Sequence, residues 1–127
     1  LESSALTQRA VHEFLSRGLL PLHLRRLNTA NAERCTAMLG ALESHFSDLA
    51  TWTHPTGGLF IWLTLRDTAI DAMARLPEAI ERRGVAYVPG NAFSVDGGAA
   101  NTVRLNFSAC PPEQIREGIA RLKDTLS

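Results

Sequence analysis

The sequence has little lysine and no excess of either charge. Its 127 residues include 13 acidic and 13 basic side chains, and Lys123 is the only lysine among the basic ones. The formal net charge of +0 argues against a large nucleic-acid surface, because such a surface needs a basic excess or a basic stripe. The pairs Arg25-Arg26 and Arg82-Arg83 are isolated, which is typical of solvated helix faces.

Cysteine, clustered histidine and long apolar runs are also scarce. Cys35 and Cys110 lie far apart in the sequence, and their spacing indicates neither a zinc site nor a disulfide framework. The four histidines include no pair at i,i+4, so we expect no metal site. The sequence shows no run of about 18 apolar residues and no signal peptide. We therefore expect a cytoplasmic protein that does not enter the membrane.

The remaining composition predicts one globular domain with a hydrophobic core, because 45% of the residues are hydrophobic. Apolar spacing predicts helices over residues 4–17, 22–45, 69–83 and 112–126. Apolar runs bounded by glycine and proline predict strands over residues 59–65, 85–88 and 101–108. We expect Pro77 to kink the third helix or to split it in two. Residues 48–55 are predicted to form a connection.

This order of elements predicts an α+β fold. We expect a small, mostly antiparallel sheet of about three strands, backed by helices and preceded by one long helix. The strand over 59–65 is almost continuously apolar, which suits a central strand covered on both faces. The first helix and the start of the long helix carry more apolar surface than the remaining chain obviously covers.

The segment Asn101–Ser108 is the most informative stretch, because it places an arginine in the middle of a predicted strand. Apolar and polar residues alternate along it, as Thr102, Val103, Arg104, Leu105, Asn106 and Phe107. A guanidinium stays charged and is costly to bury without a partner. Two interpretations remain open from the residues alone. Arg104 lies on a wet face or in an internal salt bridge, or it binds an anion, since its planar fork fits a carboxylate.

The other candidate motifs are weaker. Gly57-Gly58 precedes a strand rather than a helix, so it offers no helix N-terminus to a phosphate and predicts a turn with positive φ. No nucleophile elbow of the G-x-S-x-G kind is present.

Taken in order, three segments resemble the class I/II aminotransferases of the pyridoxal phosphate (PLP) fold-type I superfamily. Pro55–Trp62 resembles that family's P-x-G-G-x-F-x-W strand, and Gly84–Phe93 resembles its G-V-x-x-x-P-G-x-x-F segment. Asn101–Ser108 resembles its N-x-x-R-L-x-F-s strand. His23–Leu27 is similar to the start of the helix that joins the family's two domains. The closest branch holds 2-aminoadipate and kynurenine aminotransferases and the MocR/GntR-type regulators.

The resemblance implies a domain organisation. Residues 21–127 would form the small C-terminal domain of an aminotransferase, and residues 1–20 a helix that continues from a large domain outside this sequence. The long helix would then link the two domains. The parent would bind PLP, act on an amino-acid or keto-acid substrate, and form a homodimer.

The resemblance also implies roles for individual residues. Arg104 matches the arginine that binds the α-carboxylate of the substrate. Gly57 and Gly58 would let the backbone approach the substrate and let the small domain close. Asn106 is expected to take part in substrate binding. Phe60 and Phe93 either line the same pocket or pack in the core, and core packing remains an alternative for Asn106 as well.

The scarcity of lysine bears directly on this resemblance. PLP enzymes hold their cofactor as a Schiff base to a lysine. Lys123 lies off the apolar stripe of the last helix, so we expect it to face solvent, where nothing lowers its pKa. The family's lysine, its pyridinium-binding aspartate and most of its phosphate cup belong to the large domain. We therefore expect no catalytic or cofactor-binding residue in this chain, and no PLP binding or transamination by the chain alone.

Two other functions remain open. The chain could be the effector-binding end of a MocR/GntR-type transcription regulator, in which case the parent would also bind DNA. It could also be a free-standing α+β binding or dimerisation module, although the apolar surface of the first helices argues against a soluble monomer of that kind.

Overall fold

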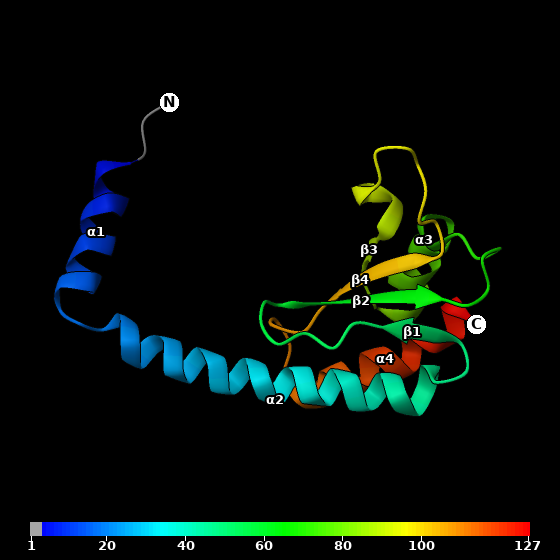
Figure 1. The fold of residues 1–127 in the computed structure, drawn as a ribbon, viewed down its shortest axis with the longest axis horizontal. Coiled ribbons are helices and arrows are strands. Elements are labelled where there is room, and N and C mark those ends of the chain that lie inside the picture. The colour runs from blue at the N-terminus through cyan, green and yellow to red at the C-terminus, as the bar shows by residue number, and fades with distance from the viewer. Residues whose placement is uncertain (1–3) are drawn as a thin grey trace. The chain divides into compact units, whose positions relative to one another are not determined.

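A long helix and a four-stranded antiparallel sheet dominate the computed structural model, which describes residues 4–127 (Figure 1). In chain order the elements are α1 (Ala5–Ser16), α2 (Leu20–Phe46), β1 (Ala50–Trp52), β2 (Phe60–Leu65), α3 (Ala72–Arg83), β3 (Val88–Pro89), the 3-10 helix η1 (Gly90–Phe93), β4 (Thr102–Asn106) and α4 (Pro112–Leu126). The chain divides into two units, one ending at Ala32 and one from Glu33 to Ser127. The boundary lies inside α2.

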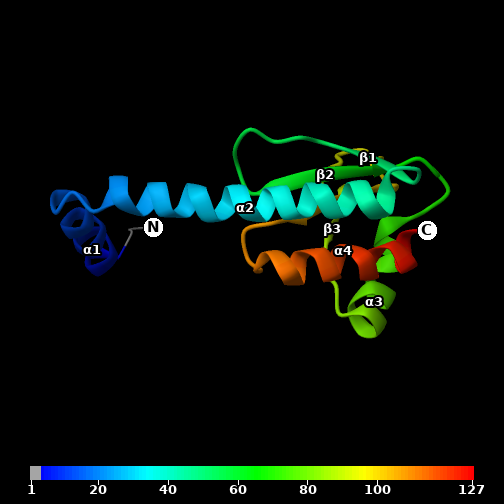
Figure 2. The same ribbon diagram turned by 90° about the horizontal axis from the view of Figure 1, so that it is seen from below.

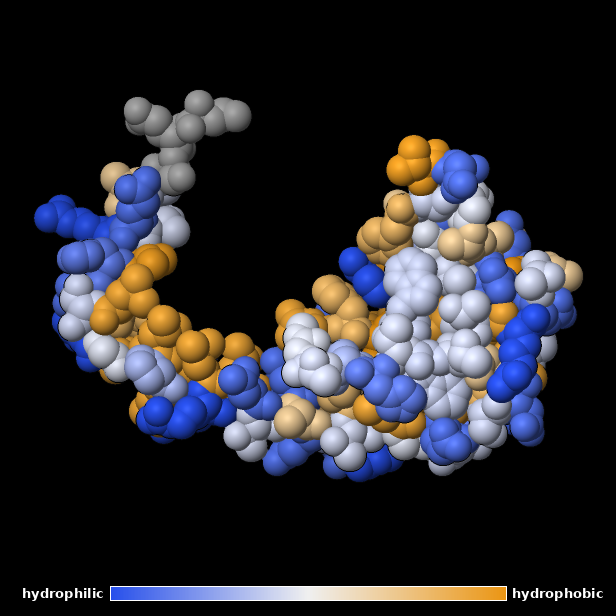
Figure 3. All heavy atoms as spheres, viewed as in Figure 1, coloured by the Kyte–Doolittle hydropathy of each residue, from blue (hydrophilic) through white to orange (hydrophobic). Residues whose placement is uncertain are grey.

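The first unit is helical and has almost no core of its own. None of the residues of α1 is buried, and the edge contact between Phe14 and His23, 5.9 Å between ring centroids, is the ring contact that joins α1 to α2. Its large apolar side chains are exposed: Leu6, Val11, Leu15, Leu19, Leu20, Leu22, Leu24 and Leu27. They gather along this helical segment in Figure 3. The predicted excess of apolar surface on these helices is confirmed.

The second unit contains the sheet, with strand order β1-β2-β4-β3 and every neighbouring pair antiparallel. The predicted α+β class is confirmed. The fourth strand, β1, lies within the segment that the sequence predicted as a connection. It is three residues long and pairs only with β2, through Ala50↔Leu65, Thr51↔Thr64 and Trp52↔Leu63. Such a short strand leaves too little alternation for a sequence pattern to reveal it.

One face of the sheet forms the core. Its buried strand residues are Ile61, Leu63, Leu65, Val103 and Leu105. The C-terminal half of α2 and the whole of α4 lie on this side of the sheet (Figures 1 and 2). They contribute buried residues at helical spacing: Met38, Leu42 and Phe46 from α2, and Ile115, Ile119, Leu122 and Leu126 from α4. Burying each large side chain stabilises the fold by roughly 1.5–3 kcal/mol.

The opposite face of β2 is not covered by a second layer in this chain. Phe60 is 39% exposed, and Trp62 and Thr64 are only half-buried. The expectation of a strand covered on both faces is therefore wrong for the described residues. The two aromatic residues on this face lie beside an arginine of β4, since Phe60 contacts its side chain and Trp62 is its partner in the strand register.

Helix α3 begins at Ala72, later than predicted, because Asp71 caps it. The Asp71 Oδ1 atom accepts hydrogen bonds from the backbone N–H groups of Met73 (2.8 Å) and Ala74 (3.2 Å), which are donors that the first helical turn leaves unpaired. Gly84 ends the helix at a φ of 65°. Pro77 lies inside one helix, so the alternative of two short helices is wrong.

Strand β3 is shorter than predicted because the chain before it turns toward α3. It pairs with β4 only through Val88↔Arg104 and Pro89↔Val103. The buried Tyr87 hydroxyl donates a hydrogen bond of 2.8 Å to the Ala72 carbonyl oxygen. This bond joins the segment before β3 to the first turn of α3.

We expect Tyr87 to make the fold sensitive to strong alkali. Burial raises the pKa of Tyr87 to about 12, with Arg75 lowering the pKa and Asp71 raising it to smaller extents. Because the folded state favours the neutral phenol, its contribution is complete below the unfolded-state pKa of about 10 and is lost as the pH rises toward 12. Tyr87 is the only tyrosine, so tyrosinate absorbance at 295 nm reports it alone.

The expected midpoint of this titration is about 12 in native protein and about 10 in urea. Tyr87→Phe should abolish the signal and serves as the blank. Equal midpoints in native and unfolded protein would contradict the buried environment of the hydroxyl.

Candidate functional site

Arg104 lies at the centre of the sheet, on the face that the helices leave uncovered. In β4 it is paired with Trp62 of β2 on one side and with Val88 of β3 on the other. Its neighbours Val103 and Leu105 are buried, while Arg104 itself is half-buried. The period of two along a strand therefore directs Arg104 away from the core.

The guanidinium of Arg104 has no acidic partner within residues 4–127. None of the ion pairs and hydrogen bonds of the described residues includes its side chain, and its Nε atom is buried without a hydrogen-bond partner. The internal salt bridge that the sequence left open is absent from this part of the chain. A partly desolvated cation without a counter-charge is costly, and an anion from outside would offset that cost.

Two phenyl rings contact the guanidinium, and one of them also contacts Trp62. The Arg104 Cζ atom lies over the ring of Phe60, 4.1 Å from its centroid, and over the ring of Phe93, 4.5 Å from its centroid. Trp62 contacts Phe93 edge to face, with 5.7 Å between centroids and 63° between planes. Phe60 and Phe93 are 39% and 48% exposed, so neither is a core residue, and the alternative of core packing is wrong for both.

The close contact of Gly90 with β4 places Phe93 beside Arg104. Gly90 is buried at the start of η1, and a Cβ atom added to it would lie 1.7 Å from the Thr102 Oγ1 atom. That hydroxyl donates a hydrogen bond of 2.8 Å to the Ala99 carbonyl oxygen. A side chain at position 90 would therefore push η1, with Phe93, away from the sheet.

Gly57 and Gly58 lie in the turn that leads into β2, exposed to solvent. Gly58 has a φ of +80°, which confirms the predicted positive φ. A Cβ atom at either position would meet no atom within 4 Å, so the described residues leave open space at this turn. Their proposed approach to the substrate stays a prediction.

Asn106 shares the exposed face of β4 with Arg104 and is paired with Phe60. Its Oδ1 atom accepts hydrogen bonds from the backbone N–H (2.6 Å) and the hydroxyl (2.8 Å) of Ser108. The side-chain oxygen is therefore engaged in the turn that follows β4. A role of Asn106 in substrate binding stays a prediction.

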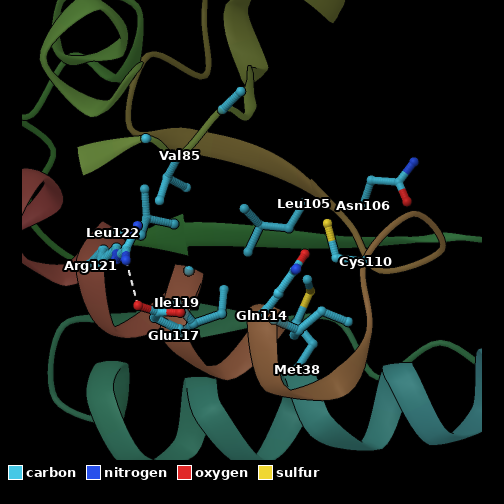
Figure 4. Close-up of a pocket in the computed structure, with 14 residues that line it drawn as sticks. Met38, Val85, Leu105, Asn106, Cys110, Gln114, Glu117, Ile119, Arg121 and Leu122 are labelled. Carbon is cyan, nitrogen blue, oxygen red and sulfur yellow. Dashed lines mark hydrogen bonds and ion pairs between the residues drawn. The ribbon is translucent and has the colours of Figure 1, made fainter. Parts of the chain in front are cut away.

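A cavity of about 400 Å³ lies elsewhere in the second unit, between α4, the end of β4 and residues 84–86 (Figure 4). Leu105, Ile119 and Leu122 form apolar walls, and Cys110 and Gln114 also line it. The ion pair between Glu117 and Arg121 belongs to the same wall. Asn106, at the end of β4, lines this cavity, but Arg104 does not.

Within residues 4–127, no group of three or more histidine, cysteine or acidic side chains is placed to hold a metal ion. Cys35 and Cys110 are both free thiols, and burial raises the pKa of Cys35. No helix in this described part is long and apolar enough to span a membrane.

Lys123 does not have the surroundings of a Schiff-base lysine for PLP. Lys123 is exposed on α4, whereas the four residues of the predicted apolar stripe, Ile115, Ile119, Leu122 and Leu126, are buried. A Schiff-base lysine requires a site that excludes water, whereas this position on α4 is open to solvent. The expectation that this chain holds no cofactor-binding residue stays a prediction.

The structure shows that Trp62 and Gly90 also shape the surroundings of Arg104, which sequence reasoning did not find. From the sequence, Trp62 belongs to a strand expected to be covered on both faces, and Gly90 lies among the glycine and proline residues that bound the strand over 85–88. A correct register between β2 and β4 would have shown that Trp62 is opposite Arg104. The close contact of Gly90 with Thr102 depends on the fold and leaves no local signal.

Comparison with known proteins identifies the family. The model for class I and II aminotransferases matches residues 1–122, so this chain belongs to the class I and II aminotransferase family. It is 40% identical over 124 residues to aromatic-amino-acid aminotransferase 1 of Thermococcus litoralis, covering 98% of this chain and 29% of that protein. It is also 32% identical over 123 residues to an uncharacterized helix-turn-helix transcriptional regulator of Bacillus subtilis, covering 97% of this chain and 25% of the regulator.

A solved structure shows the same fold. The α-aminoadipate aminotransferase of Thermus thermophilus, complexed with N-(5'-phosphopyridoxyl)-L-leucine, superposes with a TM-score of 0.82 and 36% identity. The match covers 91% of this chain and 29% of that structure. The chain therefore spans about three tenths of the length of these aminotransferases. The predicted resemblance to the branch with 2-aminoadipate aminotransferases and regulators is confirmed.

Proposed function

We propose that this chain is the substrate-carboxylate-binding domain of a PLP-dependent aminotransferase. The observation that carries the proposal is Arg104, a half-buried guanidinium that has no acidic partner among residues 4–127 and lies over two phenyl rings on an open face of the sheet. A planar fork of donors orients a carboxylate through two parallel hydrogen bonds. The membership of the class I and II aminotransferase family supports the same proposal.

In this proposal the chain binds and orients the substrate. Arg104 would hold the α-carboxylate so that the neighbouring Cα–H bond has one orientation. The open turn at Gly57-Gly58 would allow the domain to close over the substrate and exclude water. PLP, bound in the parent by residues outside this chain, would supply the electron sink for amino-group transfer. Alone, the chain is predicted to be inactive.

The proposed substrate class is L-α-amino acids and the corresponding keto acids. The relatives' names point to aromatic amino acids and to 2-aminoadipate, and a neighbouring structure holds a leucine adduct. All of these amino acids share the α-carboxylate and differ in the side chain. The shared group is the one that Arg104 would bind. We further propose that the parent is a cytoplasmic homodimer that contains the large domain.

A second function is favoured by one observation. Several relatives of 28–32% identity are helix-turn-helix transcriptional regulators. In a parent of that kind, Arg104 would bind an amino-acid-like effector, and DNA would be a further partner. The identity to aminotransferases is higher, at 36–40%, and we therefore place the enzyme first.

The test uses the full-length polypeptide loaded with PLP. We expect it to transfer the amino group of L-phenylalanine to a 2-oxo acid, and to act far more slowly on 2-phenylethylamine, which lacks only the carboxylate. Equal rates for the two amines would contradict a carboxylate-binding role. Sequence-specific DNA binding with no turnover of any amino acid would instead support the regulator.

A further inference from the structure

Phe60 and Phe93 hold the Arg104 guanidinium from two different elements. Phe60 belongs to β2 and reaches Arg104 diagonally across the sheet, because its direct partner is Asn106. Phe93 ends η1 and contacts both Arg104 and Trp62. The Cζ atom lies over the faces of both rings at 4.1 and 4.5 Å, so two separate elements contact the same cation.

The exposure of these rings argues against a purely structural role. Within this chain the rings are 39% and 48% exposed, so neither belongs to the hydrophobic core of the second unit. What the rings do cover is the cation. They remove water from Arg104 without neutralising it, because a phenyl ring attracts a cation through its quadrupole and carries no net charge.

The buried donors of Arg104 define the direction from which an anion can approach. Its Nε atom is buried and has no partner, whereas the two Nη atoms are not among the buried unpaired atoms. A carboxylate therefore meets the guanidinium at its Nη1–Nη2 end in this arrangement. An approach from the side, which needs Nε, is closed.

We propose, building on the carboxylate-binding function above, that Phe60 and Phe93 are positioning residues. They fix the side-chain rotamer of Arg104 so that it accepts the substrate carboxylate end-on, through Nη1 and Nη2. An arginine side chain loses rotamer entropy when it becomes ordered. If the two rings order Arg104 before the ligand binds, the free energy of binding no longer includes this entropy loss. Local exclusion of water also strengthens each hydrogen bond to the carboxylate.

The test measures equilibrium binding to the full-length polypeptide, so that turnover is not required. The probes are 3-phenylpropionate and 3-phenylpropanamide, which have nearly the same shape and differ in charge. The variants are Phe60→Leu and Phe93→Leu, which remove a ring but keep an apolar side chain, each in wild-type and Arg104→Ala backgrounds. Phe60→Tyr and Phe93→Tyr, which keep the ring, are the conservative controls.

We expect each leucine variant to weaken binding of the acid by roughly two- to thirtyfold, the range of a cation–π contact, and to leave binding of the amide unchanged. The tyrosine variants should bind the acid nearly as well as wild type. In the Arg104→Ala background, the leucine changes should have no further effect on the acid.

Contrary results would distinguish a failure of the positioning role of the two rings from a failure of the carboxylate site at Arg104. Equal losses for acid and amide, or losses that persist without Arg104, would show that the rings only support the fold and would overturn the positioning role. Undiminished acid binding in both leucine variants would overturn it as well. Wild-type protein that binds the acid no better than the amide would instead reject the carboxylate site itself.

Discussion

Replacing Arg104 with lysine in the full-length parent should lower kcat/KM for L-phenylalanine by about 10- to 150-fold. A hydrogen bond to a charged group contributes about 1.5–3 kcal/mol, and each factor of ten corresponds to about 1.4 kcal/mol. Lysine keeps the charge but loses the planar fork, and its single ammonium cannot form two parallel bonds. It also cannot fill the space that the guanidinium occupies beside Phe60 and Phe93.

Steady-state kinetics with two amines would check this expectation. KM for L-phenylalanine should rise, while the slow reaction of 2-phenylethylamine should not change, because that amine has no carboxylate to lose. Arg116→Lys is the matched control, since Arg116 is an exposed residue of α4 outside the site. An Arg104→Lys enzyme with wild-type kcat/KM for L-phenylalanine would reject the proposed role of Arg104.

Replacing Gly90 with alanine should destabilise the second unit by about 3 kcal/mol, at the upper end of the cost of overpacking. The new Cβ atom would lie 1.7 Å from the Thr102 Oγ1 atom and 3.0 Å from the Ala99 carbonyl oxygen and the Thr102 Cβ atom. Thr102 cannot easily turn aside, because it is buried, β-branched and hydrogen-bonded to Ala99. Relief therefore requires a shift of η1.

Thermal unfolding, followed by tryptophan fluorescence, should show a midpoint lower by on the order of 10 °C. The control is Gly40→Ala, the same chemical change at an exposed position of α2 where nothing lies within 4 Å. This change should be neutral or stabilising by up to about 1 kcal/mol. Thr102→Ala should recover part of the loss in a double variant, because it removes Oγ1. A Gly90→Ala protein as stable as wild type would contradict the close contact.

Much of the fold is predictable because its signals are local. The helices over α2, α3 and α4 have apolar residues at helical spacing and end at glycine or are followed by turns, and β2 and β4 have strand-like runs. These patterns depend only on residues near one another in the chain. The errors occur where local signals are weak or where distant contacts decide. Strand β1 is held by pairing with β2, and Tyr87 shortens β3 by its bond to α3.

The candidate site, too, was predictable from the sequence only in part. Arg104 stands out in the sequence because a charged residue inside an apolar strand is unusual, and the family resemblance gives it a role. The resemblance also names Phe60 and Phe93, but the residues alone do not separate pocket lining from core packing. Their exposure and their contacts with Arg104 depend on the strand register and on the position of η1.

The sequence by itself determined the α+β class and pointed to the one arginine in the middle of an apolar strand, because residue types and their spacing carry both signals. The resemblance of three motifs indicated the family. Only the tertiary structure decided that Arg104 has no acidic partner among the described residues and that two phenyl rings hold it. The physical reason is that partners of a β-strand residue lie across the sheet, where sequence separation carries no information about distance.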